Sequence, residues 1–231
     1  MKFAFSFLTI WLLRSAGLMA QNVVDRPLLN FYDEFRTTRY RDKLAGDSPV
    51  AGSPYESDQF IKGEIVTTNR IRYSGIPLQL NLYTNQMEFK SEDDQVFYIG
   101  MPEMLEYVLI GNDKYIYCPY SFGSKIQKGY FKVLAEGKAL LLQKKNVILK
   151  PAEEAKAYQE AIPATYVKAA DDFFIRVPPG EAKRITNKKD LAEVLGNYPP
   201  ELDAFIKKNK IRFNKADDLK ELMTYYFSLS Q

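Results

Sequence analysis

One stretch, residues 129–149, most constrains how this chain can fold. Its sequence, GYFKVLAEGKALLLQKKNVIL, places apolar-rich runs on both sides of Glu136-Gly137. An acidic residue followed by glycine suits a two-residue hairpin turn, because glycine readily adopts a positive φ. With that loop Val133 pairs with Leu140. One face of the hairpin is then apolar and carries Phe131, Val133, Leu140 and Leu142. The other face is mixed and carries Tyr130, Lys132, Leu134, Ala139, Leu141 and Gln143. The stretch therefore predicts an antiparallel hairpin with one face in a core and the other face wet.

Further strand-like runs flank this hairpin. Leu78, Leu80 and Leu82 alternate with polar neighbours, which is the period of a half-buried strand. Turn signals recur at intervals of about 8–12 residues, as in antiparallel sandwiches, barrels and curved sheets. The 16 Tyr and 15 Phe residues also favour strands. After the hairpin, 165–168 and 173–177 read as two strands joined by a turn. Residues 59–185 are therefore predicted to be mainly β.

Two other regions have helical patterns. Residues 25–44 place Leu28, Leu29, Tyr32 and Phe35 near helical spacing. Residues 187–231 begin with Asn187, a good helix cap, and hold a later apolar stripe of Leu219, Leu222, Met223 and Tyr226. The predicted fold class is α+β: a large antiparallel β-meander, as a curved sheet or half-barrel, packed with C-terminal helices.

The first twenty residues have the pattern of a secretory signal peptide. Lys2 is followed by an apolar run over 3–13 that is too short to span a bilayer. We expect residues 1–20 to be a signal peptide and 21–231 a single exported domain, periplasmic or secreted, with no transmembrane anchor after cleavage. Removing Lys2 and Arg14 leaves 30 basic against 29 acidic residues. Such a balanced chain has no global field to attract nucleic acid or an anionic membrane.

The composition excludes several catalytic devices. The chain has no His, so it cannot form a Ser-His-Asp triad, a Cys-His dyad or an imidazole-ligated zinc site. The single cysteine, Cys118, allows no intrachain disulfide and is most simply a small buried hydrophobe. We predict no catalytic, cofactor-binding or metal-binding residue, and an enzyme is the less favoured class.

Weak local signals remain. Ser121 and Lys125 share a loop, but a Ser-Lys dyad needs a buried lysine, so a polar hairpin loop is the favoured interpretation. The pairs at 93–94 and 171–172 are adjacent aspartates in predicted turns, which suits neither acid-base catalysis nor an EF-hand.

Tyrosines are a more informative set, because many lie on or beside predicted strands. If several share an exposed face, that face could stack on a sugar or an extended peptide; if helices cover them, they are core. The predicted binding surface comprises Tyr73, Tyr83, Tyr98, Tyr115, Tyr117 and Tyr130.

Several segments carry a family resemblance: GSPYESDQFIKGEIVT, IPLQLNLYTNQMEFKSEDDQVFYI, KGYFKVLAEGKALLLQKK, NKKDLAEVL, IKKNKIRF and LKELMTYYFSL. They resemble a broad family of exported bacterial proteins with no assigned function. The resemblance covers nearly all of the chain after residue 20. It implies one domain exported from a double-membraned bacterium, and it transfers no catalytic residue.

Two functional hypotheses follow. The first is a non-catalytic cell-envelope protein that binds an envelope protein, a peptide, a glycan or a lipid through a sheet face. A half-barrel carrier of lipidic ligands, which needs an apolar cavity, belongs to the same class. The second is a hydrolase of envelope polymers that uses carboxylates alone, with two acids about 5–10 Å apart in one cleft.

Overall fold

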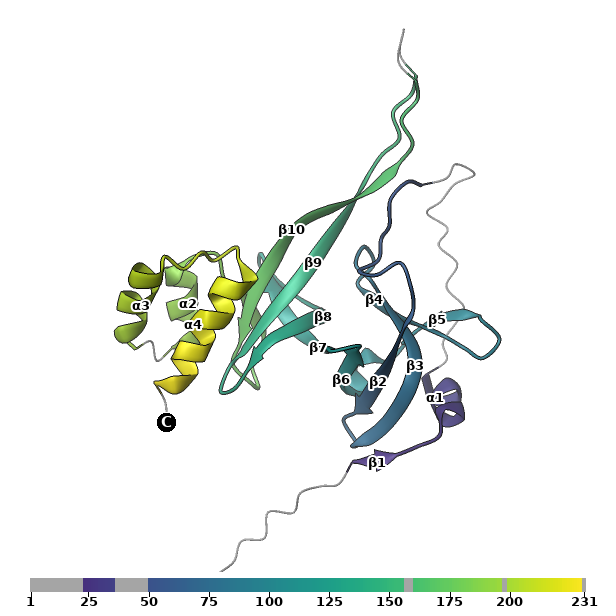
Figure 1. Cartoon of the computed structure of the whole chain (residues 1–231), viewed down its shortest axis with the longest axis horizontal. Helices are drawn as coiled ribbons and strands as arrows, with labels where there is room; N and C mark the ends of the chain where they lie inside the picture. The colour runs from purple at the N-terminus through teal and green to yellow at the C-terminus, as the bar shows by residue number, and fades with distance from the viewer. Residues whose placement is uncertain (1–22, 36–49, 156–159, 197–198, 230–231) are drawn as a thin grey trace, which may run out of the picture.

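The computed structural model describes residues 23–35, 50–155, 160–196 and 199–229 (Figure 1). The predicted signal peptide, 1–20, lies outside these residues. The helices are α1 (Leu28–Phe35), η1 (Pro102–Met104), α2 (Lys188–Leu195), α3 (Glu201–Asn209) and α4 (Ala216–Ser228). The strands are β1 (Val24–Asp25), β2 (Ile61–Thr67), β3 (Ile71–Asn81), β4 (Gln86–Lys90), β5 (Val96–Tyr98), β6 (Leu105–Ile110), β7 (Asp113–Phe122), β8 (Lys125–Glu136), β9 (Leu140–Lys150), β10 (Thr165–Arg176) and β11 (Ala182–Arg184).

The strands form one continuous, mainly antiparallel sheet. Their spatial order is β11-β10-β9-β8-β7-β6-β2-β3-β4-β5, and β1 adds a short parallel pairing to β3. The C-terminal helices lie at one end of the molecule and α1 lies at the other (Figure 1). Among the described residues no helix is long and apolar enough to cross a membrane. The predicted α+β class with an antiparallel meander is confirmed.

Strand β11 bends the second half of the sheet back on itself. It pairs with β10 in antiparallel fashion, and its Ala182 also pairs with Tyr120 of β7 in parallel fashion. Strands β7 to β11 therefore surround a small core, which we call the closed core. Its fully buried members include three large side chains: Phe131, Leu142 and Phe174.

The hairpin at 129–149 exists, but its register differs from the predicted one. The loop has three residues, so Glu136 pairs with Leu140, and Val133 pairs with Leu142 rather than with Leu140. A bulge at Leu134 takes up the extra residue on β8. The bulge keeps Phe131, Val133, Leu140 and Leu142 on the closed core, as the sequence pattern predicts.

The second face of this hairpin is not wet. Ala139 and Leu141 pack into a second core beneath α2, α3 and α4, together with the predicted stripe of α4. Tyr130 packs into a third core that is shared with β2–β6 and α1. The prediction of an exposed second face is therefore wrong, because two other parts of the chain cover it.

Strand β10 also corrects the sequence interpretation. The residues 165–168 and 173–177 do not form two strands around a turn. One strand runs from Thr165 to Arg176 and pairs with β9, and the residues between Ala169 and Asp172 form a bulge. The polar and small residues here form a bulge within a strand rather than a turn. Strand β10 continues through them because β9 pairs with it on both sides of the bulge. Beyond Gln143, β9 and β10 continue past β8 as a two-stranded ribbon (Figure 1).

The helices follow their sequence signals more closely. The Asn187 side chain accepts bonds from the backbone N–H groups of Lys189 and Asp190 at the start of α2. Gly196 ends α2 with a φ of 65°. In α1 the buried residues are Phe31, Tyr32 and Phe35, whereas the predicted core residue Leu29 is exposed.

Because both faces of β9 are buried, we expect truncation on either face to destabilise the protein. Leu141→Ala and Leu142→Ala should each lower the free energy of unfolding by about 2–5 kcal/mol. Ile148→Ala on the same strand, where the side chain is 50% exposed, should change it by less than about 1 kcal/mol. Urea unfolding of the three variants measures this. A loss for Leu142→Ala alone would mean that the helices do not cover β9.

Candidate functional site

A polar row crosses the sheet between the helix-covered core and the core shared with α1. Tyr115, Lys132 and Gln143 are aligned on neighbouring strands β7, β8 and β9. The Lys132 Nζ lies 2.5 Å from Asp113 Oδ2, and Gln143 Nε2 donates to Asp171 Oδ2 at 2.6 Å. The row lies where the two cores meet, and its buried or half-buried polar groups are satisfied by these partners.

The segment over 50–58 brings a further carboxylate to this row. The backbone N–H of Ala51 donates to Ala164, and that of Glu56 donates to Leu80. A Cβ on Gly52 would lie 2.4 Å from the Tyr166 carbonyl oxygen, and its φ is +74°. The segment therefore joins the β9–β10 ribbon to β3 in a path that needs glycine. Backbone hydrogen bonds therefore attach this segment at both ends.

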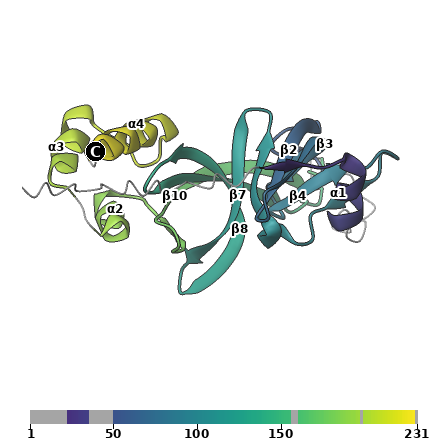
Figure 2. The same cartoon turned by 90° about the horizontal axis from the view of Figure 1, so that it is seen from below.

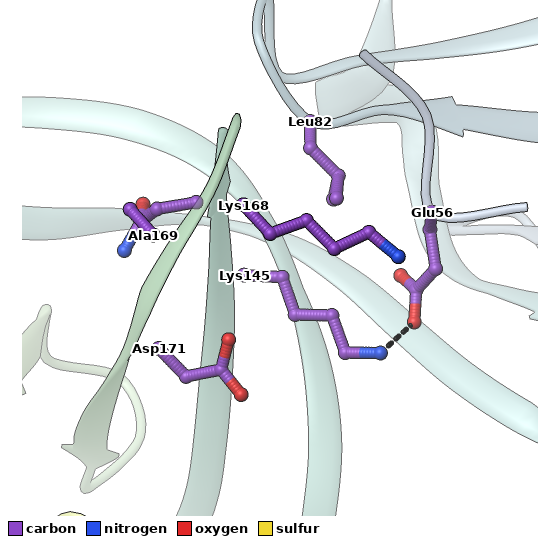
Figure 3. A pocket seen from close by; sticks show the side chains of 7 residues that line it. Glu56, Leu82, Lys145, Lys168, Ala169 and Asp171 are labelled. Atoms are coloured by element: carbon purple, nitrogen blue, oxygen red, sulfur yellow. Dashed lines mark hydrogen bonds and ion pairs between the residues drawn. The ribbon is translucent and has the colours of Figure 1, made fainter. Parts of the chain in front are cut away.

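These parts enclose a cleft of about 300 Å³ (Figure 3). Its lining consists of Glu56, Leu82, Lys145, Asn146, Lys168, Ala169 and Asp171. Figure 3 shows Lys145 and Lys168 extending side by side from the ribbon toward Glu56. The cleft thus presents two cations, two carboxylates, an amide and a small apolar wall within one space.

Both oxygens of Glu56 accept bonds within the protein. Lys145 Nζ lies 2.5 Å from Oε1, and the Tyr115 hydroxyl donates to Oε2 at 2.9 Å. Burial and the adjacent Glu56 carboxylate raise the pKa of Tyr115, so this hydroxyl stays protonated and donates. Lys168 is exposed and forms no ion pair with the described residues. It is therefore the cation in the cleft that can meet a ligand with little rearrangement.

Lysine 144 lies on the opposite side of β9 and has a separate environment. Burial lowers its pKa, and the nearby Asp172 carboxylate partly opposes that effect. Its Nζ donates to Asn146 Oδ1 at 3.1 Å, while Asn146 Nδ2 donates to Asp172 at 3.0 Å. These bonds fix the amide of Asn146 at the edge of the cleft.

Most of the six predicted surface tyrosines do not line an open face. Tyr73, Tyr115 and Tyr130 are buried, and half-buried Tyr117 packs against the same core. The Tyr73 hydroxyl donates to Glu34 at 2.6 Å, and burial together with this carboxylate raises the pKa of Tyr73 to about 12. Tyr115, Tyr117 and Tyr130 therefore share a face that the first half of the sheet covers, whereas Tyr73 lies in that first half and packs against α1.

The other two predicted tyrosines have different positions. Tyr98 is half-buried on the edge strand β5. Tyr83 is 36% exposed and follows Leu82, a residue of the cleft wall. The ring of Tyr83 meets that of Tyr166 edge to face, with centroids 5.4 Å apart. Tyr166 lies two residues before Lys168 on the same side of β10. One aromatic pair thus stands beside the cleft.

The adjacent acids at 171–172 also differ from the predicted turn. They belong to β10 near its bulge, where Asp171 faces the cleft and Asp172 pairs with Arg184 on the other side. The pair at 93–94 does lie in an exposed turn. Within the described ranges, no three His, Cys, Asp or Glu residues are arranged to hold a metal ion.

Ser121 lies near the end of β7 and Lys125 begins β8, with Gly123 and Ser124 forming the turn between them. Ser121 Oγ donates to Glu181 Oε1 at 2.6 Å, whereas Lys125 is exposed. The two groups are therefore not coupled, in agreement with the favoured interpretation of a polar hairpin loop.

Sequence reasoning missed the main residues of the cleft: Glu56, Lys145, Asn146 and Lys168. They come from the connection over 50–58 and from β9 and β10, two strands that lie far from that connection in sequence. Alternation places Lys145 on the same face as Gln143, but the neighbouring segment at 50–58 cannot be located from local sequence. Comparisons with protein-family models, curated proteins and solved structures find no match to this chain.

The Glu56 interactions should stabilise the fold. Glu56→Gln should lower the free energy of unfolding by about 1–3 kcal/mol, since Lys145 loses its carboxylate partner in a place where Glu56 is only 16% exposed. Lys168→Gln should change it by less than about 0.5 kcal/mol. Urea denaturation compares the two variants. If both variants lost the same free energy of unfolding, Glu56 would not be more important to the fold than Lys168.

Cysteine 118 should make stability fall in alkaline solution. Burial raises the pKa of its thiol from 9.0 to about 11 in the folded protein. The unfolded chain therefore loses this proton first, so the contribution is complete below pH 9 and is lost as pH rises toward 11. Between these values, the slope of unfolding free energy against pH should be steeper in the native protein than in Cys118→Ala, by up to about 1.4 kcal/mol per pH unit. Identical slopes would show that the thiol ionises equally in both states.

Proposed function

We propose that this protein is a non-catalytic, exported binding module of the cell envelope and that its ligand site is the cleft between Glu56 and Lys168. The ligand class that fits best is a polar glycan or peptide with an anionic group. The observation that carries the proposal is the free cation Lys168 inside the cleft, with the edge-to-face pair of Tyr83 and half-buried Tyr166 next to its Leu82 wall.

The chemistry of the lining supports a polar ligand rather than a lipid chain. Leu82 and Ala169 are the apolar residues of the wall, and the rest of the lining is polar or charged. An aliphatic chain would leave those groups without hydrogen bonds, which is unfavourable. Sugars and peptides instead offer hydroxyl or carbonyl oxygens to Lys168, and a flat face to a tyrosine ring.

A carboxylate-based hydrolase is the second candidate, because Glu56 and Asp171 face one cleft. Its weakness is that both carboxylates already have partners: Lys145 and Tyr115 bind the first, and Gln143 binds the second. An acid-base pair needs one group free to give a proton and another free to activate water. Because both carboxylates are already paired within the protein, a binding site is favoured over a hydrolase.

Export is inferred from the pattern over 1–20. Cell fractionation of the native host should find the protein in the periplasm or the medium, with a new N-terminus close to Gln21. A cytoplasmic protein that keeps its first twenty residues would contradict this part of the proposal.

Soluble peptidoglycan fragments, each a disaccharide with a short acidic peptide, are a direct probe of the cleft. Calorimetric titration should show binding that weakens about fivefold or more in both Tyr83→Ala and Lys168→Gln. Lys207→Gln on α3 is the matched control, because Lys207 is also exposed but lies outside the cleft. Binding unaffected by the first two substitutions would place the ligand elsewhere. Time-dependent cleavage of the fragments that is lost in Glu56→Gln or Asp171→Asn would instead establish the hydrolase.

A further inference from the structure

The β7–β8 hairpin ends in a segment that stands away from the rest of the protein. We call residues 122–128 the hairpin tip. Every residue from Phe122 to Lys128 is exposed, and burial resumes only at Gly129. Figure 2 shows β7 and β8 as a long curved pair that crosses the middle of the molecule and projects beyond it on one side. The tip is therefore accessible from several directions.

Two large apolar side chains occupy this exposed tip. Phe122 is 58% exposed, and Ile126, at 70%, is more exposed still. In the hairpin register Phe122 pairs with Lys125 and Ile126 pairs with Ser121. Because the pairs are adjacent, Phe122 and Ile126 point to opposite faces of the ribbon. Both side chains thus meet water on a projecting segment, where burial against an apolar partner would be favourable.

The tip is also locally basic. Its sequence, FGSKIQK, holds Lys125 and Lys128 and no acidic residue. Neither lysine forms an ion pair with the part of the chain that the structure describes. The nearest contact with an acid is at the base of the tip, where Ser121 binds Glu181. Although the whole chain is nearly neutral, this projection carries a concentrated positive charge.

We propose that the hairpin tip inserts end-on into the surface of an anionic lipid bilayer. A flat protein surface laid against the ribbon would cover Phe122 or Ile126 but not both. A fluid interface that the tip enters end-on covers both faces at once, and it places the two lysines at the level of the lipid phosphates. The attraction is then local and modest, at about 1 kcal/mol, or about fivefold in partitioning, for each of the two lysines. This inference does not depend on what occupies the cleft.

Fluorescence of a tryptophan at the tip tests the proposal. The chain has one tryptophan, Trp11, within the predicted signal peptide, so the exported protein without residues 1–20 that carries Phe122→Trp reports on the tip alone. Vesicles that contain phosphatidylglycerol should shift its emission to the blue, and lipids brominated on their acyl chains should quench it. Leu29→Trp in the same exported protein is the matched control, because Leu29 is 62% exposed on α1 at another part of the surface. Its emission should not change.

Charge dependence is measured on the same variants. Vesicles of phosphatidylcholine alone should bind the tip at least tenfold more weakly, and Lys125→Gln or Lys128→Gln should each reduce partitioning into anionic vesicles about fivefold. Added salt should weaken binding as well. Absence of a blue shift at position 122, or an equal shift at position 29, would overturn the proposal. Vesicle partitioning that does not change with lipid charge, with salt or with either lysine substitution would also overturn it.

Discussion

The double pairing of β11 is the constraint on which the second half of this protein depends. By joining β10 to β7 it converts a meander edge into a closed wall around Phe131, Leu142 and Phe174. One face of β7–β10 is thereby fixed in a core. The opposite face must be covered by something else, since alternate residues such as Leu141 and Tyr130 are also apolar or aromatic.

Two separate parts of the chain provide that cover. The C-terminal helices pack on Leu141 and Phe173, and the first half of the sheet packs on Tyr130 and Tyr115. Polar side chains occupy the strip between these two covers. The strip stays partly solvated, and ion pairs such as Lys145–Glu56 form there. The cleft is thus a consequence of how two cores share one face. The concave wall and the free cation of this strip are the features that a ligand would use.

Local sequence predicts much of this fold but little of the cleft. Alternation identifies the strands, and capping residues such as Asn187 and Gly196 locate α2. These signals depend on neighbours in the chain, which is why they can be recognised. Three other features depend on contacts between residues far apart in sequence. They are the cover over Tyr115 and Tyr130, the position of Glu56 and the closure by β11. The predicted tyrosine surface could not be distinguished from core for the same reason: an amphipathic tyrosine suits either place.

We propose two functional surfaces, the cleft for ligand binding and the hairpin tip for membrane insertion, whereas the aromatic sheet face lies in the interior. Hydrogen–deuterium exchange of the exported protein on an isolated cell-envelope fraction, compared with the free protein, tests this most directly. We expect the envelope to slow exchange over 122–128 and around 144–146 and 168–171, with little change in α3 and α4. Protection confined to the helices or to the β5 edge, or no protection at all, would contradict the account.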